Sequence, residues 1–270
     1  MHLPTVSIIT PSFNQAAFLE QTIQSILSQD YPKLEYVIMD AGSTDGSVDI
    51  ITRYEDRLAY WQSTKDNGPA SALNAGFRRC TGEILAYLNS DDCYLPGALF
   101  TASEVFEQRP EVDVIYGDID FINAQGQPTT MPGKHVHRFK AIPFNLRYMA
   151  CGCLVIPQQA SFWRRRVFER VAGFVESNVT CWDGEFFADA AMADMRFHHV
   201  PQVLAQFRIH GTSISGSGTL KAGALKARYH EDRLRLQVKW AAAGIRPSNI
   251  ERLYCRLASG LKRASRYVEC

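Results

Sequence analysis

Residues 36–47 read Y-V-I-M-D-A-G-S-T-D-G-S and hold the pattern that decides the fold. The apolar run from Tyr36 to Asp40 predicts a strand, and the D-G-S that follows predicts a helix from Ser47 to Tyr54. The same order recurs on both sides: we expect strands at Val6–Thr10, Leu58–Trp61 and Ile84–Leu88, and helices at Ala16–Ser28, Ala70–Arg79 and Gly97–Gln108. Strands and helices that alternate at this spacing form parallel βαβ units, so the expected core is an α/β, doubly wound sheet with helices on both faces.

The second half of the chain is less regular. Residues 123–150 are rich in Pro, Gly, His and Arg, which predicts a long loop or a substrate-shaping insertion. Beyond it we expect helices at Arg164–Val171 and Trp182–Met192, and strands at Phe197–Val200 and Val203–Ile209. From Leu220 onward the pattern is helical and basic. The expected division is therefore a main domain at residues 1–219 and a helical appendage at residues 220–270.

The composition is that of a folded globular protein. Of 270 residues, 46% are hydrophobic and 21% charged, with 29 Lys and Arg against 28 Asp and Glu. This balance excludes a disordered tail, a collagen and a strongly basic nucleic-acid arm. The charge is unevenly spread, because residues 221–270 hold 12 Lys and Arg but 4 Asp and Glu, a net charge of +8, which leaves −7 for residues 1–220.

Targeting signals and cysteine pairs are absent from the sequence pattern. The seven cysteines include no C-x-x-C pair, so we expect free thiols rather than a disulfide framework or a zinc ribbon. The N-terminus lacks a secretory signal, and no window reaches the ~18 uninterrupted apolar residues of a membrane span. These features predict a cytoplasmic protein, soluble or peripheral on the inner face of a membrane.

Acidic residues follow two of the predicted strands. Asp40 precedes the small residues around Gly42, which let a ligand approach the backbone, and Asp91 and Asp92 directly follow the strand that ends at Leu88. Two adjacent carboxylates favour a divalent cation held together with substrate phosphates. Each site alone is also compatible with an ordinary helix N-cap. Taken together they favour a crevice for a nucleotide and a metal at the carboxyl ends of the strands.

Four segments in register resemble glycosyltransferase family 2. They are V-S-I-I-T-P-S-F-N, V-I-M-D-A-G-S-T-D-G-S, K-D-N-G-P-A-S-A-L-N-A-G-F and T-G-E-I-L-A-Y-L-N-S-D-D, within about residues 5–118. The resemblance implies a GT-A fold, with a single Rossmann-like, doubly wound mixed sheet. It also implies a nucleotide-sugar donor, usually a UDP-sugar, and Mn²⁺ or Mg²⁺ as cofactor. Residues 1–219 would then be the catalytic domain.

The resemblance also assigns site residues for the donor. Asp40 would hold the base, and the nucleotide pocket would be lined by Thr10, Pro11, Ser12 and Phe13. Asp66 and Asn74 would border the donor site, and Asn89-Ser90-Asp91 would take the D-x-D position. The chain departs from the family pattern at Asn89, whose amide can still accept a hydrogen bond from a ribose hydroxyl. The metal ligand is then Asp91 or Asp92.

Acceptor-side residues are expected further along the chain. In C-W-D-G-E-F-F, Asp183 is the candidate general base for inverting transfer and Glu185 is the alternative. Both also suit a helix N-cap and first turn. The segment F-R-I-H-G-T-S-I-S resembles the family's R-x-H loop, in which His210 would complete the metal site or contact the diphosphate.

Other functions remain open on the sequence alone. A nucleotidyltransferase would need a Gly-rich triphosphate loop, which Ser12–Gln15 does not offer, and a processive synthase would need membrane helices. A non-catalytic nucleotide-sugar-binding or scaffold protein is the alternative outside the enzymes. The acceptor is expected to be a saccharide or a lipid-linked molecule in surface polysaccharide synthesis. The basic segment is either a solvated appendage or a peripheral anchor to anionic lipid.

Overall fold

The computed structural model of the protein describes residues 3–131, 136–211, 223–251 and 253. Its first half contains these elements: β1 (Val6–Ser12), α1 (Ala16–Leu27), β2 (Leu34–Asp40), α2 (Ser47–Arg53), β3 (Tyr60–Ser63), α3 (Pro69–Arg79), β4 (Ile84–Tyr87), β5 (Cys93–Tyr94), α4 (Ala98–Gln108) and β6 (Val114–Ile122). These follow: β7 (Arg138–Phe139), α5 (Leu146–Ala150), β8 (Ser161–Arg164), α6 (Arg165–Val171), α7 (Trp182–Met192), β9 (Phe197–Arg208) and α8 (Gly223–Ala242). Short 3₁₀ turns lie at Glu55–Arg57 and Gln158–Ala160.

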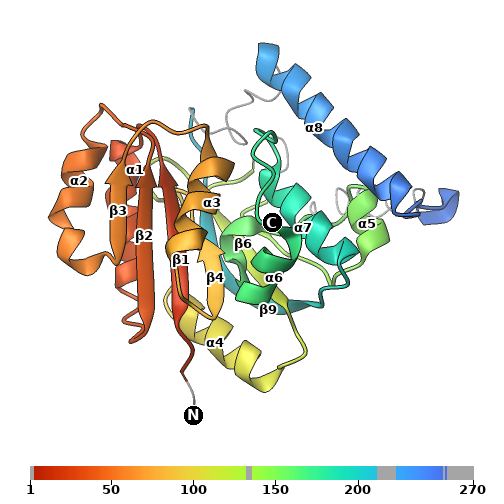
Figure 1. The fold of residues 1–270 in the computed structure, drawn as a ribbon, viewed down its shortest axis with the longest axis horizontal. Coiled ribbons are helices and arrows are strands. Elements are labelled where there is room, and N and C mark those ends of the chain that lie inside the picture. The colour runs from red at the N-terminus through yellow and green to blue at the C-terminus, as the bar shows by residue number, and fades with distance from the viewer. Residues whose placement is uncertain (1–2, 132–135, 212–222, 252, 254–270) are drawn as a thin grey trace.

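The strands form one mixed sheet in the order β3-β2-β1-β4-β8-β6-β9-β5, with β7 paired to β6. The first four strands in this order run parallel, β8 is antiparallel to both of its neighbours, and β9 is parallel to β6. Helices cover both faces of the sheet (Figure 1). The expected α/β fold with a doubly wound mixed sheet is therefore confirmed.

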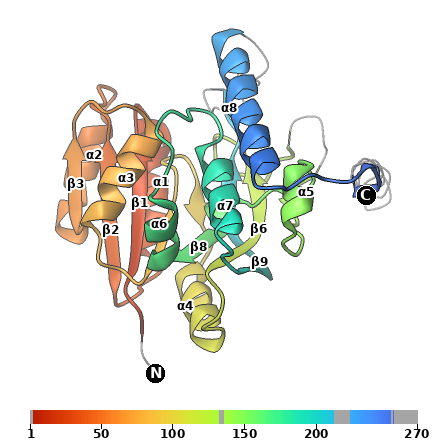
Figure 2. The same ribbon diagram turned by 45° about the vertical axis from the view of Figure 1, so that its right-hand side comes forward.

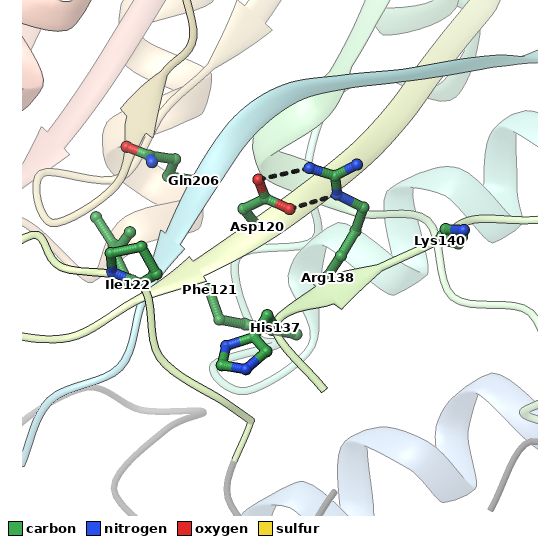
Figure 3. Close-up of a pocket in the computed structure, with 8 residues that line it drawn as sticks. Asp120, Phe121, Ile122, His137, Arg138, Lys140 and Gln206 are labelled. Atoms are coloured by element: carbon green, nitrogen blue, oxygen red, sulfur yellow. Dashed lines mark hydrogen bonds and ion pairs between the residues drawn. The ribbon is translucent and has the colours of Figure 1, made fainter. Parts of the chain in front are cut away.

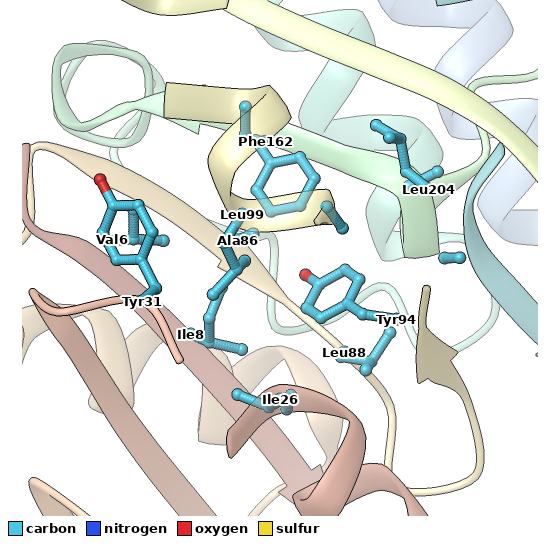
Figure 4. Packing of buried hydrophobic residues seen from close by; sticks show 14 of the residues in the cluster. Val6, Ile8, Ile26, Tyr31, Ala86, Leu88, Tyr94, Leu99, Phe162 and Leu204 are labelled. Carbon is cyan, nitrogen blue, oxygen red and sulfur yellow. The ribbon is translucent and has the colours of Figure 1, made fainter. Parts of the chain in front are cut away.

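Two apolar clusters lie on opposite faces of the sheet because successive strand side chains point to opposite sides. Ile8 and Ile38 pack with α1 and α4 in the first cluster, which Figure 4 shows around Tyr94 and Phe162. Their neighbours Ile9 and Met39 pack with α3, α6 and α7 in the second cluster. Full burial of one such side chain contributes about 1.5–3 kcal/mol.

The second half differs in detail from the sequence prediction. β6 runs from Val114 to Ile122 beside β9, and Gly117 allows the two strands to pack closely, since a Cβ there would lie 2.6 Å from Leu204 Cγ. The two strands expected before and after Pro201 are one strand, β9, in which the proline falls beside a register shift against β6. β8 was not predicted. Its four residues pair only with strands distant in sequence.

Helix α8 confirms that the start of the basic segment is helical, and it ends at Ala242. Leu236 is buried and Trp240 half-buried in the second cluster, so α8 packs against α7 (Figure 2). Within the described residues, no helix is long and apolar enough to cross a membrane. The rest of the predicted appendage, residues 254–270, lies outside the described residues.

The cysteines only partly follow the expectation of free thiols. Cys80 and Cys93 are buried thiols, and burial raises the pKa of Cys80 to about 12, which makes it unreactive. Cys153, in contrast, is disulfide-bonded. Sequence spacing does not reveal such a bond, because it depends on proximity in the fold.

Candidate active site

The carboxyl ends of β1 to β4 align at one edge of the sheet. Ser12 is paired with Asp40 and Asp40 with Ser63, while Ile9 is paired with Tyr87 near the end of β4. Asn89-Ser90-Asp91 follows β4 directly. The segments predicted to bind the donor are thus brought together at this edge.

Asp40 is buried, and its carboxylate accepts hydrogen bonds from the turn that follows it and from Ser63. Oδ2 accepts hydrogen bonds from the backbone N–H groups of Gly42 (3.1 Å) and Ser43 (2.8 Å) and from the Ser63 hydroxyl (2.6 Å). Oδ1 accepts from the Ser43 hydroxyl. These bonds fix the Gly42 turn against the end of β3. The base-binding role of Asp40 stays a prediction.

The loop after β1 is tied to the loop after β2. The Asn14 N–H donates to Ser43 Oγ (2.8 Å), the Thr44 N–H donates to Asn14 Oδ1 (2.9 Å), and the Ala16 N–H donates to Asp45 Oδ2 (2.8 Å). Pro11 is half-buried just before this loop.

The residues predicted to line the nucleotide pocket differ in how exposed their side chains are. Phe13 is 58% exposed, so its ring is available to a ligand. The Thr10 hydroxyl is buried and hydrogen-bonds Tyr36 Oη (3.0 Å). The Ser12 hydroxyl is buried and finds no partner among the described residues.

The two residues predicted to border the donor site have different hydrogen-bond partners in the structure. Asp66 accepts from the Gly68 N–H (2.7 Å) ahead of α3, and its pKa is raised by burial and, less strongly, by Asp40. Asn74 binds the segment that follows α6, and its donor-site role stays a prediction. Its amide donates to the Phe174 carbonyl (2.8 Å) and accepts from the Phe174 N–H (2.8 Å). Gly173 permits this contact, since a Cβ there would lie 2.5 Å from Asn74 Oδ1.

The two carboxylates after β4 point in different directions. Asp91 Oδ2 lies 2.9 Å from His210 Nε2. Asp92 is fully buried: Oδ1 accepts from the Arg208 N–H (2.9 Å), and Oδ2 has no partner in the described part of the chain. Burial, followed by the charge of Asp91, raises the pKa of Asp92 well above its usual range. Asn89 is half-buried and donates to Gln158 Oε1 (3.3 Å), while Ser90 is buried.

Arg208 holds this region together, a role that the sequence analysis did not assign. Its buried guanidinium donates to the Asp91 carbonyl (2.7 Å), the Asn123 carbonyl (3.0 Å) and Gln21 Oε1 (2.6 Å). The sequence feature that could have indicated this role is the arginine of the R-x-H segment, which is Arg208 itself. Gln158, which donates to the Tyr87 carbonyl (2.7 Å), was also missed.

Asp91 and His210 fit one side of a divalent cation. Adjacent ligands of an octahedral Mg²⁺ ion lie about 3 Å apart, given metal–oxygen distances of roughly 2.0–2.1 Å, and the two side-chain atoms are 2.9 Å apart. Such ions commonly take one or two protein ligands and complete their shell with phosphates and water. Among the residues that the structure describes, no three His, Cys, Asp or Glu side chains are grouped as a metal centre.

Asp183 lies in the first turn of α7. No described side chain hydrogen-bonds it, and burial raises its pKa. The preceding Trp182 Nε1 donates to Tyr87 Oη (3.0 Å), which ties this turn to the end of β4. Burial raises the pKa of Tyr87, and the charge of Asp183 raises it further, as expected for close neighbours. Asp183 is therefore an unpaired carboxylate beside the edge that carries Asn89 and Asp91.

Glu185 has a different environment although it lies only two residues away. It is buried, and its carboxylate accepts from Arg235 (2.7 Å), Lys239 (2.9 Å) and Asn178 (2.8 Å). Burial alone would raise the pKa of Glu185, but these hydrogen bonds outweigh it and lower the pKa. The carboxylate of Glu185 is therefore hydrogen-bonded to three side chains of the protein, whereas that of Asp183 has no side-chain partner among the described residues.

A separate cavity of about 330 Å³ lies beside the β6–β7 hairpin (Figure 3). His137, Lys140 and Gln206 help to line it, and Asp120 pairs with Arg138 at 2.6 Å across its wall. None of the predicted donor, metal or catalytic residues lines this cavity. The candidate site is therefore the strand edge, not this cavity.

Comparison with known families settles the class of protein. The model of the family "Glycosyl transferase family 2" matches residues 7–171, more than half of the chain. The chain belongs to glycosyltransferase family 2. An uncharacterized glycosyltransferase of Mycobacterium tuberculosis (strain ATCC 25618 / H37Rv) is 32% identical over 190 residues, which is 70% of each chain. TuaG of Bacillus subtilis (strain 168), provisionally assigned to teichuronic acid biosynthesis, is 31% identical over 57% of this chain and 61% of its own.

Solved structures share the fold of this glycosyltransferase. Residues 1–349 of S. aureus TarS in complex with UDP-GlcNAc superpose with a TM-score of 0.63 and 20% identity, over 79% of this chain and 61% of that TarS chain. The mannosyltransferase PcManGT from Pyrobaculum calidifontis, in complex with GDP-Man and Mn²⁺, gives a TM-score of 0.59 and 20% identity, over 97% and 81% of the two chains. The predicted GT-A fold is confirmed.

Proposed function

We propose that this glycosyltransferase moves a sugar from a UDP-sugar to a hydroxyl of a saccharide or lipid-linked acceptor, with inversion, in the synthesis of a bacterial surface glycan. The observation that carries the proposal is the pairing of Asp91 with His210 at the strand edge, with the unpaired Asp183 carboxylate nearby. The UDP-GlcNAc complex of TarS supports the donor class. The teichuronic acid assignment of TuaG supports the glycan class.

The donor end of the site would bind the nucleoside diphosphate. The exposed ring of Phe13 is available to stack on the base, with the Gly42 turn beside it. Asp91 and His210 would hold Mn²⁺ or Mg²⁺, which supplies positive charge to the leaving diphosphate. Asp92 is assigned to the support of β9 rather than to the metal, because its carboxylate is fully buried against the Arg208 backbone.

The acceptor end of the site would depend on Asp183. In a single displacement, the acceptor oxygen forms a bond to the anomeric carbon as the bond to the nucleoside diphosphate breaks. Asp183 takes the hydroxyl proton. Because the attack comes from the face opposite the leaving group, an α-linked donor gives a β-linked product. A product of retained configuration would contradict this scheme.

Nucleotide binding can be tested before the acceptor is known. We expect Mn²⁺ with UDP or UDP-GlcNAc to raise the melting temperature, since a ligand at 100 times its Kd adds about 2.7 kcal/mol to stability. Asp91→Asn should lose most of the Mn²⁺-dependent part of the shift. The control Asp49→Asn changes an exposed carboxylate on α2 and should behave as the wild type. A protein that none of UDP, GDP and their sugars stabilises would refute the donor proposal, and binding without turnover would favour the scaffold alternative.

The outer face of α8 supports a peripheral membrane contact through the proposed C-terminal segment, residues 220–270. Leu234 is 53% and Val238 61% exposed, one helical turn apart, beside the exposed Arg233. Exposed apolar side chains next to cations bind anionic lipid surfaces. We expect the protein to co-sediment with phosphatidylglycerol vesicles and the double variant Leu234→Glu/Val238→Glu to lose most of this binding. Equal binding to pure phosphatidylcholine vesicles would argue against the proposal.

A further inference from the structure

The face of α8 that packs on α7 carries a group of buried and half-buried charged side chains. Arg235 Nη2 lies 2.7 Å from Glu185 Oε2, and Lys239 Nζ lies within 3 Å of both Glu185 and Asp189 on α7. Asp232 is 1% exposed. The described hydrogen bonds from α8 side chains to the rest of the protein all end between Ser177 and Asp189. Within the described part of the chain, the hydrogen bonds between α8 and the rest of the protein therefore meet the segment that surrounds Asp183.

Asp232 binds the backbone just ahead of the candidate base. Its Oδ2 accepts from the N–H groups of Val179 (3.2 Å) and Thr180 (3.2 Å) and from the Thr180 hydroxyl (2.7 Å). Arg235 donates to Ser177 Oγ (3.2 Å) as well as to Glu185. These contacts hold residues between Ser177 and Thr180, which precede Asp183, and Glu185, which follows it.

The other end of the same segment is held by α3. Asn74 makes the two hydrogen bonds to Phe174 described above and a third to Glu176 Oε1 (3.1 Å). Between these two supports, the Asn178 amide oxygen accepts from the Cys181 N–H (2.9 Å) and so closes the turn into α7. The segment from Phe174 to Cys181 is thus fixed at both ends and in the middle.

We propose that α8 positions the catalytic base, with Asp232 and Arg235 as positioning residues that act through the segment 177–181. The inference rests on the proposed role of Asp183. Leu236 and Trp240 already supply apolar docking of α8, whereas burying Asp232 and Glu185 costs desolvation that apolar contacts would avoid. The polar contacts converge on the backbone around one unpaired carboxylate, and a displacement of about 1 Å at such a group can cost on the order of 10²-fold in rate.

The kinetic test uses the full chain with Mn²⁺ and either UDP-GlcNAc or GDP-mannose, following release of the nucleoside diphosphate. We expect Asp232→Asn and Arg235→Met to lower kcat about tenfold while the donor KM stays within about twofold, because the donor end of the site is untouched. Arg235→Lys should recover part of the loss. The matched controls Glu231→Gln and Lys226→Met alter exposed charges on the same helix and should retain the wild-type kcat.

A second measurement does not depend on turnover. The carboxyl ¹³C signal of Asp183, identified by its absence in Asp183→Asn, reports how this group titrates beside Tyr87 and Cys181. We expect Asp232→Asn and Arg235→Met to move its midpoint toward that of an ordinary aspartate, and Glu231→Gln to leave it unchanged. If Asp232→Asn matches Glu231→Gln in both the titration and kcat, the positioning role is wrong. If Asp183→Asn keeps full turnover, the proposed base is wrong instead.

Discussion

Replacing Asp183 with asparagine should abolish sugar transfer, lowering kcat by about 10³-fold or more, while nucleotide binding persists. Asparagine keeps the size and shape of the side chain, but it takes no proton from an acceptor hydroxyl. General-base catalysis contributes about 10²–10⁴-fold in enzymes. The measurement is the rate of nucleoside diphosphate release, together with the thermal shift produced by UDP and Mn²⁺.

The pH dependence gives an independent check on the same residue. A general base works unprotonated, so kcat/KM should rise with pH through the pKa of Asp183. Burial raises that pKa, and the half-maximal pH should therefore lie above the ordinary aspartate value of about 3.9. Glu185→Gln is the comparison. It should lower stability, because it removes the negative partner of Arg235 and Lys239. The rise of kcat/KM with pH should remain in this variant. An Asp183→Asn variant within tenfold of the wild-type kcat would exclude this assignment.

Replacing Arg208 with methionine should cost about 3 kcal/mol or more in the free energy of unfolding. The buried guanidinium serves the carbonyls of Asp91 and Asn123 and the amide of Gln21, and each acceptor left unsatisfied in the interior costs about 1–3 kcal/mol. The measurement is chemical denaturation followed by tryptophan fluorescence. The variant should also bind UDP and Mn²⁺ more weakly, since Arg208 fixes the backbone of Asp91.

Two further variants sharpen the Arg208 result. Arg78→Met removes an exposed arginine at the end of α3 and should change stability by less than about 0.5 kcal/mol. Arg208→Lys keeps the charge but has too few donors for every acceptor, so its stability should fall between those of the wild type and the methionine variant. Equal stability of Arg208→Met and Arg78→Met would show that the carbonyls find other partners.

Local patterns were enough to predict β1 to β4 and the helices α1 to α4, but not the two-residue strand β5, which pairs with the distant β9. The runs that end at Ser12, Asp40 and Tyr87 are short, apolar and separated by helices with clear periodicity, so each element and its place follow from neighbouring residues. The clustering of the donor segments then follows from the parallel order of the strands. β8 could not be predicted in this way, because its residues form a strand only between β4 and β6, which come from distant parts of the chain.

The site was harder to predict wherever a side chain acts over a long sequence distance. Asn74 lies in a segment typical of the donor site, yet its partner Phe174 is 100 residues away. Asp183 and Glu185 are equivalent by sequence and differ in the structure because Arg235 and Lys239 of α8, together with Asn178, bind Glu185 alone. No motif marks such contacts, since they depend on how a late helix packs against an earlier one.

The continuous strand β9 limits where the chain can accept an insertion or a deletion. It begins five residues after α7, which carries Asp183, and ends at Arg208, two residues before His210. Twelve residues of strand span about 40 Å, so β9 carries the chain from beyond the end of α7 back to the edge of the sheet, where His210 meets Asp91. One residue inserted near its centre would turn the later side chains to the opposite face of the sheet. Variation in length is therefore better tolerated in loops such as residues 123–131 than within this strand.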